Sequence, residues 1–225
     1  PAGDYLIGKE GNDIYQAGIS LPSNVAFILD DNATLQMATN DKWNYCLIDI
    51  TRETNVIVRG GRLIGDRETH IYTPRESDGS TVHDEGHLIC IQFSHFVLVE
   101  STLLTKANGD GILIVGSLSD GASHDITIRD SEFDNNRRQG ISIVGGVRVK
   151  IANNEIHHTV GTPPQFGIDL EGAGRYENRD VHIIGNYFHN NRGGDIVNTD
   201  GRNVYVDQNR LEQGADSRYI DVPLV

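Results

Sequence analysis

Residues 141–156 read ISIVGGVRVKIANNEI, and this stretch carries the pattern that decides the fold. It contains one apolar pair at Ile141 and Ile143, a second pair at Val149 and Ile151, and a single apolar residue at Ile156. In a β-strand every second side chain faces the same side, so each pair indicates a short strand with one buried face. The stretch therefore predicts three short strands separated by turns.

The same unit recurs along the chain. First pairs stand at Ile48/Ile50, Ile89/Ile91, Ile112/Ile114, Ile141/Ile143, Ile168/Leu170 and, more weakly, Ile196/Asn198. Second pairs stand at Val56/Val58, Val97/Val99, Ile126/Ile128, Val149/Ile151, Val181/Ile183 and Val204/Val206. The third apolar residue of each unit follows five residues later, at Leu63, Leu104, Phe133, Ile156, Phe188 and Leu211. Such a unit cannot bury its apolar face alone, so the repeats must stack, and the prediction is an all-β parallel β-helix with three strands per coil.

One turn of the repeat carries asparagines at the same place. Asn154, Asn186 and Asn209 each stand two residues before the third apolar residue of their unit. Stacking would bring them into one column, in which each side chain can bond to the next coil. We expect an asparagine ladder at this turn.

The composition limits the partners of the chain. With 225 residues, 37% of them hydrophobic, we expect a single domain over residues 1–225. The 32 acidic and 19 basic residues give a formal net charge of −13, which repels nucleic acid and anionic lipid. Because no apolar run reaches the roughly 20 residues that a membrane span needs, we expect a soluble protein with no membrane partner.

The two cysteines, Cys46 and Cys90, are too few for a disulfide framework or a four-cysteine zinc site. The simplest interpretation is two free thiols.

Four segments resemble the right-handed parallel β-helix proteins of the pectate-lyase-like superfamily, above all the phage tailspikes and bacterial polysaccharide-acting members. They are residues 21–25, 109–112, 135–142 and 164–171, which read LPSNV, GDGI, NNRRQGIS and PQFGIDLE. The resemblance spans nearly the whole chain and implies a right-handed coil. Members usually begin with a Gly-Asp-Gly and Asp-Asp stretch before a capping helix, which this chain lacks, so we expect native sequence upstream of Pro1.

The catalytic motifs of the superfamily do not transfer to this chain. Residues 198–201 read NTDG and match only part of a polygalacturonase motif, and the Asp-Pro-His of alginate epimerases and the Arg-x-x-Pro-x-x-Arg of pectate lyases are absent. The resemblance thus implies the fold and a polysaccharide partner, while the chemistry has to be argued from this chain's own residues.

Inserted segments indicate where a ligand would bind. Surplus residues occur at 65–86, 116–125 and 172–180, which flank the first strands of several coils. We expect them to wall a groove over the outward face of those strands, a shape that suits an extended polysaccharide.

Three carboxylates are predicted to meet in this groove. Asp169 and Glu171 are two residues apart on one strand, so their Cα atoms lie about 6.6 Å apart on one face, and Asp195 on the next coil should lie within roughly 8 Å of Asp169. Paired carboxylates with room for a water molecule are typical of inverting glycoside hydrolysis. The alternative is a solvated or calcium-collecting acidic patch.

Other groups near the acids are predicted to bind the sugar. They are Asp110, Arg138, Gln139, Ser142, Arg175, Tyr176 and His87. Asp110 in Gly-Asp-Gly can instead serve only as a turn former, too far from Asp169 to join its pair. His83 and His87 lack the further ligands that zinc requires, so we expect no metal site, with calcium possible and no cofactor required. His157 and His158 are expected at the surface.

The sequence therefore favours hydrolysis of a neutral or mixed polysaccharide, because an acidic protein attracts a polyuronate poorly unless calcium bridges the charges. The alternatives are a calcium-assisted lyase or epimerase, and a non-catalytic tailspike or adhesin shaft that binds a surface glycan. Outward aliphatic residues such as Leu113, Val115 and Val144 leave a homotrimer open. The resemblance places the protein outside the cell, at the cell surface or on a virion.

Overall fold

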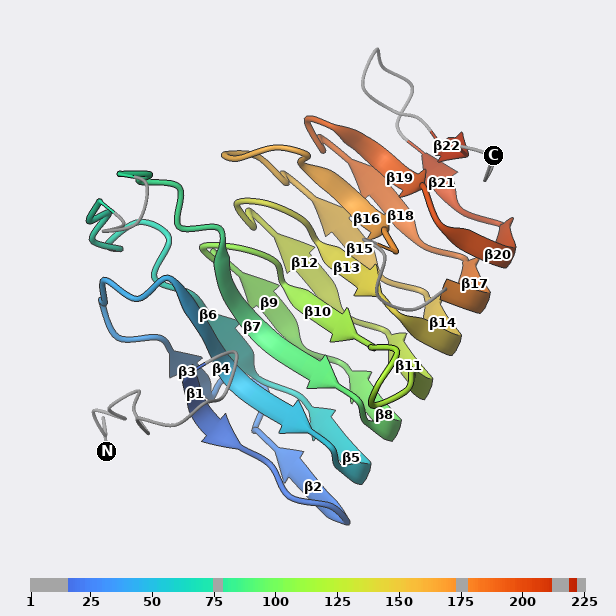
Figure 1. Cartoon of the computed structure of the whole chain (residues 1–225), viewed down its shortest axis with the longest axis horizontal. Helices are drawn as coiled ribbons and strands as arrows, with labels where there is room; N and C mark the ends of the chain where they lie inside the picture. Colours follow the sequence, from blue (N-terminus) through green and yellow to red (C-terminus); the bar gives the residue numbers. More distant parts are fainter. Residues whose placement is uncertain (1–15, 75–78, 173–177, 212–218, 222–225) are drawn as a thin grey trace.

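The computed structural model describes residues 16–74, 79–172, 178–211 and 219–221. Its strands form three parallel sheets that stack coil upon coil (Figure 1). The first sheet contains β1 (Gln16–Ser20), β4 (Asn44–Thr51), β7 (Glu85–Gln92), β10 (Ile112–Val115), β13 (Ile141–Val144), β16 (Phe166–Leu170), β19 (Gly194–Asn198) and β22 (Tyr219–Asp221). The second contains β2 (Val25–Ile28), β5 (Thr54–Arg59), β8 (His95–Glu100), β11 (Ser123–Arg129), β14 (Gly146–Ala152), β17 (Asn178–Ile184) and β20 (Gly201–Asp207). The third contains β3 (Thr34–Gln36), β6 (Arg62–Ile64), β9 (Leu103–Thr105), β12 (Glu132–Asp134), β15 (Glu155–His157), β18 (Tyr187–His189) and β21 (Arg210–Leu211).

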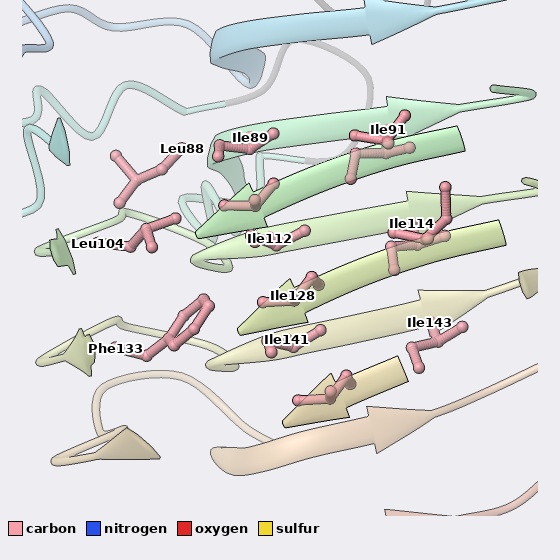
Figure 2. Packing of buried hydrophobic residues seen from close by; sticks show 14 of the residues in the cluster. Leu88, Ile89, Ile91, Leu104, Ile112, Ile114, Ile128, Phe133, Ile141 and Ile143 are labelled. Atoms are coloured by element: carbon pink, nitrogen blue, oxygen red, sulfur yellow. The ribbon is translucent and has the colours of Figure 1, made fainter. Parts of the chain in front are cut away.

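The register confirms the predicted stacking of the repeat. In the first sheet Ile112 pairs with Ile89 and Ile141, and Ile143 pairs with Leu170. The second pairs and the third apolar residues of successive units are likewise in register. Figure 2 shows these side chains meeting inside the coil, where the isoleucines are fully buried. Each such burial contributes about 1.5–3 kcal/mol, so the stacked columns hold the coils together.

The coil has one more turn at its start than the pattern predicted. Strands β1, β2 and β3 pair with β4, β5 and β6, and Leu35 stacks on Leu63. The signal was present in Val25 and Phe27, which lie in register with Val56 and Val58. The repeat pattern missed this coil because its first strand, β1, has a weak apolar character.

The asparagine ladder is confirmed. The Asn154 amide nitrogens, main-chain and side-chain, donate to Asn186 Oδ1 at 2.9 and 3.0 Å, and those of Asn186 donate to Asn209 Oδ1 at 2.8 and 3.0 Å. The residue before the ladder takes a left-handed conformation in each coil, with φ of 56° at Asn153 and 68° at Gly185. Asparagine and glycine tolerate this conformation better than other residues, which explains their recurrence at this turn.

One column of the first sheet departs from strict alternation. Leu47 and Ile48 are neighbours in sequence, yet both lie in the main core, and the same holds for Leu88 and Ile89. The next coils carry a glycine at this position, Gly140 among them, and a Cβ there would meet the core side chain of Ile156. Two consecutive residues therefore face inward at this corner of every coil. Strict alternation would also turn the residue before this pair inward. Because two neighbouring side chains already face the core at the corner, that residue faces outward instead.

The cysteines were predicted wrongly. Cys46 and Cys90 form a disulfide with a Cα–Cα distance of 5.9 Å. Alternation from Ile48 places Cys46 inside, but the corner turns it to the outer side, where Cys90 lies. The two sulfur atoms thereby meet on one face.

The outer aliphatic side chains do not supply a contact surface for other chains. Cys46 and Cys90 form a second apolar cluster with Leu113, Val115 and Val144, which we call the aliphatic cluster. All five are buried within one chain. The argument for a homotrimer that rested on these residues therefore fails.

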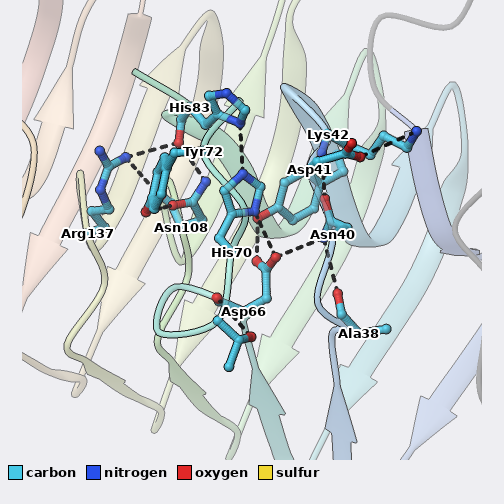
Figure 3. A network of polar contacts seen from close by, with 12 residues as sticks. Ala38, Asn40, Asp41, Lys42, Asp66, His70, Tyr72, His83, Asn108 and Arg137 are labelled. Carbon is cyan, nitrogen blue, oxygen red and sulfur yellow. Dashed lines mark hydrogen bonds and ion pairs between the residues drawn. The ribbon is translucent and has the colours of Figure 1, made fainter. Parts of the chain in front are cut away.

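The segment between β6 and β7 is fixed to the coil by a buried polar network (Figure 3). His70 Nδ1 lies 2.8 Å from Asp66 Oδ2, and His70 Nε2 lies 2.8 Å from His83 Nδ1. The network continues at the other ring nitrogen of His83, because Nε2 lies 2.7 Å from the carbonyl oxygen of Thr73. Asn108 Nδ2 donates to the carbonyl oxygen of His83 at 2.6 Å, which ties the segment to the next coil.

The other two insertions are shorter than predicted. Strand β11 already begins at Ser123 and β17 at Asn178, and residues 173–177 lie outside the described part of the chain. Within the described ranges the chain has no helix, hence none long and apolar enough to cross a membrane.

Candidate functional site

The candidate site lies on the outer face of the first sheet, over β7, β10, β13 and β16. Because Ile112 pairs with Ile89 and Ile141, Asp110 is in register with His87 and Gln139. These three residues precede the inward-facing corner, so they occupy the same outward column as Cys46. The next outward column contains Ser142, which pairs with Asp169. Most of the predicted site residues are thus brought together on one face.

Arg138 joins two of the predicted acids. Its Nη1 donates to Asp110 Oδ2 at 3.0 Å and to Ser142 Oγ at 3.3 Å, and its Nη2 donates to Glu171 Oε1 at 3.0 Å. The two carboxylates raise the pKa of the Arg138 guanidinium, against the effect of burial. Arg138 is therefore a permanent positive charge at the centre of what we call the ionic cluster, Asp110, Arg138, Asp169 and Glu171.

Asp110 is part of this cluster, contrary to the interpretation that it only forms a turn. Its side chain is fully buried, and Oδ2 lies 3.4 Å from His87 Nδ1. Burial raises the pKa of Asp110, while Arg138 and His87 oppose that rise. The sequence register placed Asp110 too far from Asp169 to share a site, but the length of the Arg138 side chain connects them.

Asp169 is the perturbed acid of the site. Gln139 Nε2 donates to Asp169 Oδ2 at 2.5 Å, and Gln139 Oε1 accepts from the main-chain nitrogen of Phe166 at 2.7 Å, which fixes the orientation of the amide. Burial, and next the charge of Glu171, raise the pKa of Asp169 to about 7, with Arg138 opposing. A carboxyl group with this pKa holds a proton near neutral pH and can donate it.

Glu171 differs from Asp169 in exposure. Its side chain is 31% exposed, whereas the whole of Asp169 is 4% exposed. The contact with Arg138 Nη2 at 3.0 Å holds the Glu171 side chain in place. The two acids predicted as a pair are therefore neighbours in different environments, which is the condition for assigning them opposite roles.

Asp195 does not join them. It is in register with Gly167, as predicted, but this is the inward-facing corner position, where a Cβ on Gly167 would meet the core residue Phe188. Asp195 is buried there, and its Oδ1 accepts from Asn191 Nδ2 at 3.4 Å. The prediction that Asp195 joins the other two acids was therefore wrong. Alternation along the strand turns its side chain outward, whereas the corner turns it inward.

The remaining predicted residues have mixed outcomes. His87 is buried beside Asp110 and its Nε2 lies 3.3 Å from Glu85 Oε2, a partner that the sequence did not reveal. Arg175 and Tyr176, predicted to hold the sugar, lie outside the described residues.

A second polar group adjoins the aliphatic cluster, where Gln92 Nε2 donates to Asp49 Oδ1 at 3.3 Å.

These observations define the class of the protein: a parallel β-helix with a buried ionic cluster on the outer face of one sheet. The family described as the right-handed β-helix region matches residues 8–176 and, in an overlapping match, residues 75–217. The chain belongs to this right-handed β-helix family, which confirms the expected hand of the coil.

Two relatives come from Bacillus subtilis (strain 168). The uncharacterized protein YclG is 30% identical over 230 residues, which covers 94% of this chain and 39% of YclG. The SPbeta prophage-derived uncharacterized protein YorA is 32% identical over 188 residues, which covers 77% of this chain and 32% of YorA. The chain thus spans about a third to two fifths of the length of these curated relatives.

Among solved structures, the chain is similar to the A-module of the Azotobacter vinelandii mannuronan C-5 epimerase AlgE6. The TM-score is 0.62 with 14% sequence identity, over 84% of this chain and 48% of that chain. At this identity the likeness concerns the fold.

Proposed function

We propose that the ionic cluster cleaves glycosidic bonds in an extended polysaccharide by acid–base catalysis. The observation that carries this proposal is the pKa of Asp169, raised to about 7 beside the partly exposed carboxylate of Glu171. Glycoside hydrolysis needs one carboxyl that still holds a proton and one that has lost it. The two neighbours supply both forms at the same pH.

Each residue then has a distinct role. Asp169 protonates the oxygen of the leaving sugar, and Glu171 accepts a proton from the attacking water. Gln139 orients the carboxyl of Asp169, and Arg138 positions Glu171. Ser142, which Arg138 contacts, lies in the same column as Asp169 and supports the position of Arg138. All these groups belong to the protein, so the proposed reaction requires no bound cofactor.

Charge favours a neutral or mixed glycan as the substrate. The chain has a formal net charge of −13, and the positive charge of Arg138 is shared between two carboxylates of the cluster. A polyuronate would meet repulsion at such a surface unless a cation bridged the charges. The similar AlgE6 module is a mannuronan C-5 epimerase, which supports the polysaccharide class without fixing the reaction.

The proposal is tested with Asp169→Asn and Glu171→Gln on a panel of neutral polysaccharides, with new reducing ends as the readout. Each substitution is expected to lower the rate at least about 100-fold while binding to the glycan is retained. Asp49→Asn is the matched control, because Asp49 lies on the same sheet face and bonds to Thr51 and Gln92, which lie outside the cluster. Undiminished cleavage by both variants contradicts the assignment.

A lyase or epimerase is the second candidate, because the AlgE6 module that shares this fold is a mannuronan C-5 epimerase. Cleavage of alginate or pectate with a rise in absorbance from unsaturated ends would support it over hydrolysis. A glycan that binds with no product from either assay would instead identify a non-catalytic adhesin or tailspike domain.

We place the reaction outside the cell, at a cell surface or on a virion. The Cys46–Cys90 disulfide supports an oxidising compartment, because cytosolic reductants keep such thiols reduced.

A further inference from the structure

A group of histidines lies on the third sheet, remote in sequence from the ionic cluster. His157 in β15 pairs with His189 in β18 and with Asp134 in β12, so the three form one column across neighbouring coils. His158 follows His157 with a φ of 52°. This left-handed turn brings its ring back beside the column. We call His157, His158 and His189 the histidine cluster.

The donor atoms of the cluster are close together. One ligand atom from each histidine lies within 4.8 Å of the others. His157 Nδ1 and His158 Nδ1 are 2.6 Å apart, and each lies 3.3 Å from Asp134 Oδ1. In a tetrahedral zinc site with bonds of about 2.0–2.2 Å, neighbouring ligand atoms are separated by roughly 3.3 Å. The two distances to Asp134 Oδ1 match this spacing, whereas the two nitrogens, at 2.6 Å, have to move apart to bind one ion.

Carboxylates on the far side of the rings set the required tautomer. His157 Nε2 lies 3.3 Å from Glu132 Oε1, and His189 Nε2 lies 3.0 Å from Glu155 Oε1. At His157 the carboxylate at Nε2 keeps the proton on that nitrogen, which leaves the Nδ1 lone pair for a metal. Nδ1 of His189 lies 2.8 Å from Oδ1 of the exposed Asn190, so this side chain has to rotate away before His189 can bind the ion. Glu132 and Glu155 are themselves in register, so the arrangement repeats from one coil to the next.

We propose that the histidine cluster, together with Asp134, binds one zinc-class divalent ion. Two imidazole nitrogens at 2.6 Å repel each other unless a proton or a cation lies between them, and a carboxylate beside both adds the charge that favours a cation. His158 is 51% exposed at its side chain, which gives an ion access and lets this ring adjust to the metal. Imidazole and carboxylate ligands together suit Zn²⁺ and its neighbours in the first transition row.

The other histidine groups of the described chain lack this arrangement. The buried network of Figure 3 contains two histidines, His70 and His83, rather than three. His95 and His124 on the second sheet stack at 4.8 Å, much as His157 and His189 stack at 4.5 Å. That pair has no third histidine and binds its neighbouring carboxylate through Nδ1 of His124. It is therefore a built-in comparison for the proposed site.

The bound ion would tie three coils together at their third strands, since its ligands come from β12, β15 and the turn after it, and β18. This site is independent of the proposed polysaccharide chemistry, whose residues lie on the first sheet. Its expected consequence is a more stable coil, because a ligand that binds only the folded state raises the unfolding temperature.

The experiment is a calorimetric titration of untagged, EDTA-stripped protein with Zn²⁺, repeated with Co²⁺ to record visible absorption bands. One ion per chain is expected, with tetrahedral Co²⁺ bands and a higher unfolding temperature on addition of Zn²⁺. His158→Ala removes an exposed ligand without opening the core and should weaken binding at least tenfold. His189→Gln, a second variant, should do the same, while His124→Ala should bind as the unmodified chain does.

Circular dichroism of the metal-free variants establishes that each is folded. The proposal is overturned if the unmodified chain shows no saturable binding of one ion. It is equally overturned if folded His158→Ala and His189→Gln bind Zn²⁺ as tightly as His124→Ala does.

Discussion

Two halves of the same sheet face contrast sharply in this protein. Toward the N-terminus, the outward positions of β4, β7 and β10, with Val144 at the end of β13, hold the aliphatic cluster and its disulfide. Toward the C-terminus, the outward positions around β13 and β16 hold the ionic cluster. Both halves are well covered: Leu113 and Asp169 are each 4% exposed. An outward direction in a β-helix therefore does not mean contact with water.

The two halves differ in what their side chains require in order to be buried without destabilising the fold. Apolar side chains gain by leaving water, and any neighbour of suitable shape serves them. A buried carboxylate needs a particular partner, because without one it must lose its charge or destabilise the fold. The charged half is consequently the half in which single partners matter, and it is also where a pKa is displaced into the range useful for catalysis.

The largest effect on the free energy of unfolding is expected from replacing Arg138, the positive charge at the centre of the ionic cluster. Arg138→Met leaves the fully buried Asp110 without its guanidinium partner. Loss of one member of a buried pair typically lowers the free energy of unfolding by about 3–5 kcal/mol. Urea denaturation at neutral pH measures this change.

Two further variants make that result specific. Arg148→Met removes an exposed ion pair with Asp125 and should change the free energy of unfolding by less than about 1 kcal/mol. Asp110→Asn combined with Arg138→Met removes the stranded charge and should recover part of the loss. Equal losses for Arg138→Met and Arg148→Met would mean that the charged half is no more sensitive than an ordinary surface.

A smaller effect is expected from the apolar half. Replacing Cys46 and Cys90 by alanine removes a crosslink that closes a sequence separation of 44 residues. Removal of such a crosslink is expected to lower the free energy of unfolding by about 2–4 kcal/mol. The measurement is urea denaturation of the double variant beside the oxidised parent, with thiol titration of the unfolded parent as the control. Two reactive thiols per chain in protein purified without reductant would contradict the disulfide.

The smallest effect concerns pH. The folded chain holds a proton on Asp169 up to about pH 7, whereas the unfolded chain releases it near the model-peptide value of 3.8. The unfolded state thus binds fewer protons in this interval, and the free energy of unfolding contributed by Asp169 falls as pH rises from about 4 to about 7. Asp169→Asn abolishes this decline and should exceed the parent in stability above pH 7 by about 1–3 kcal/mol.

Unfolding curves between pH 4 and pH 8 test this prediction. Asp125→Asn is the control, because the hydrogen bond from Arg148 lowers the pKa of Asp125, and it should leave the slope of the parent profile between pH 4 and pH 8 unchanged. Asp110 also has a raised pKa, so a decline of the same sign, caused by Asp110, should persist in Asp169→Asn. Parallel profiles for the parent and Asp169→Asn would show that Asp169 is ionised throughout, and would remove the general acid from the proposed mechanism.

Much of the fold followed from the sequence because its repeat is local and redundant. Ile141 and Ile143 are in register with the predicted residues of the neighbouring coils, and the asparagine ladder from Asn154 to Asn209 is present as predicted. Six copies of one pattern constrain the register far more than any single strand could. The site followed only in part: Asp169 and Glu171 share a face, but Asp195 and Cys46 each lie on the side opposite to that given by alternation.

The spacing of apolar residues by itself determined the coil, its three strands and the residues that fill its interior, since side-chain direction within a strand depends only on position along the strand. Which polar groups became partners was decided by the tertiary structure. At the corner entering the first sheet two consecutive side chains face inward, so the column containing Cys46, His87 and Asp110 turns outward. The disulfide and the ionic cluster both depend on that bend, because only the stacking of whole coils fixes where a strand curves and which distant side chains then come within reach.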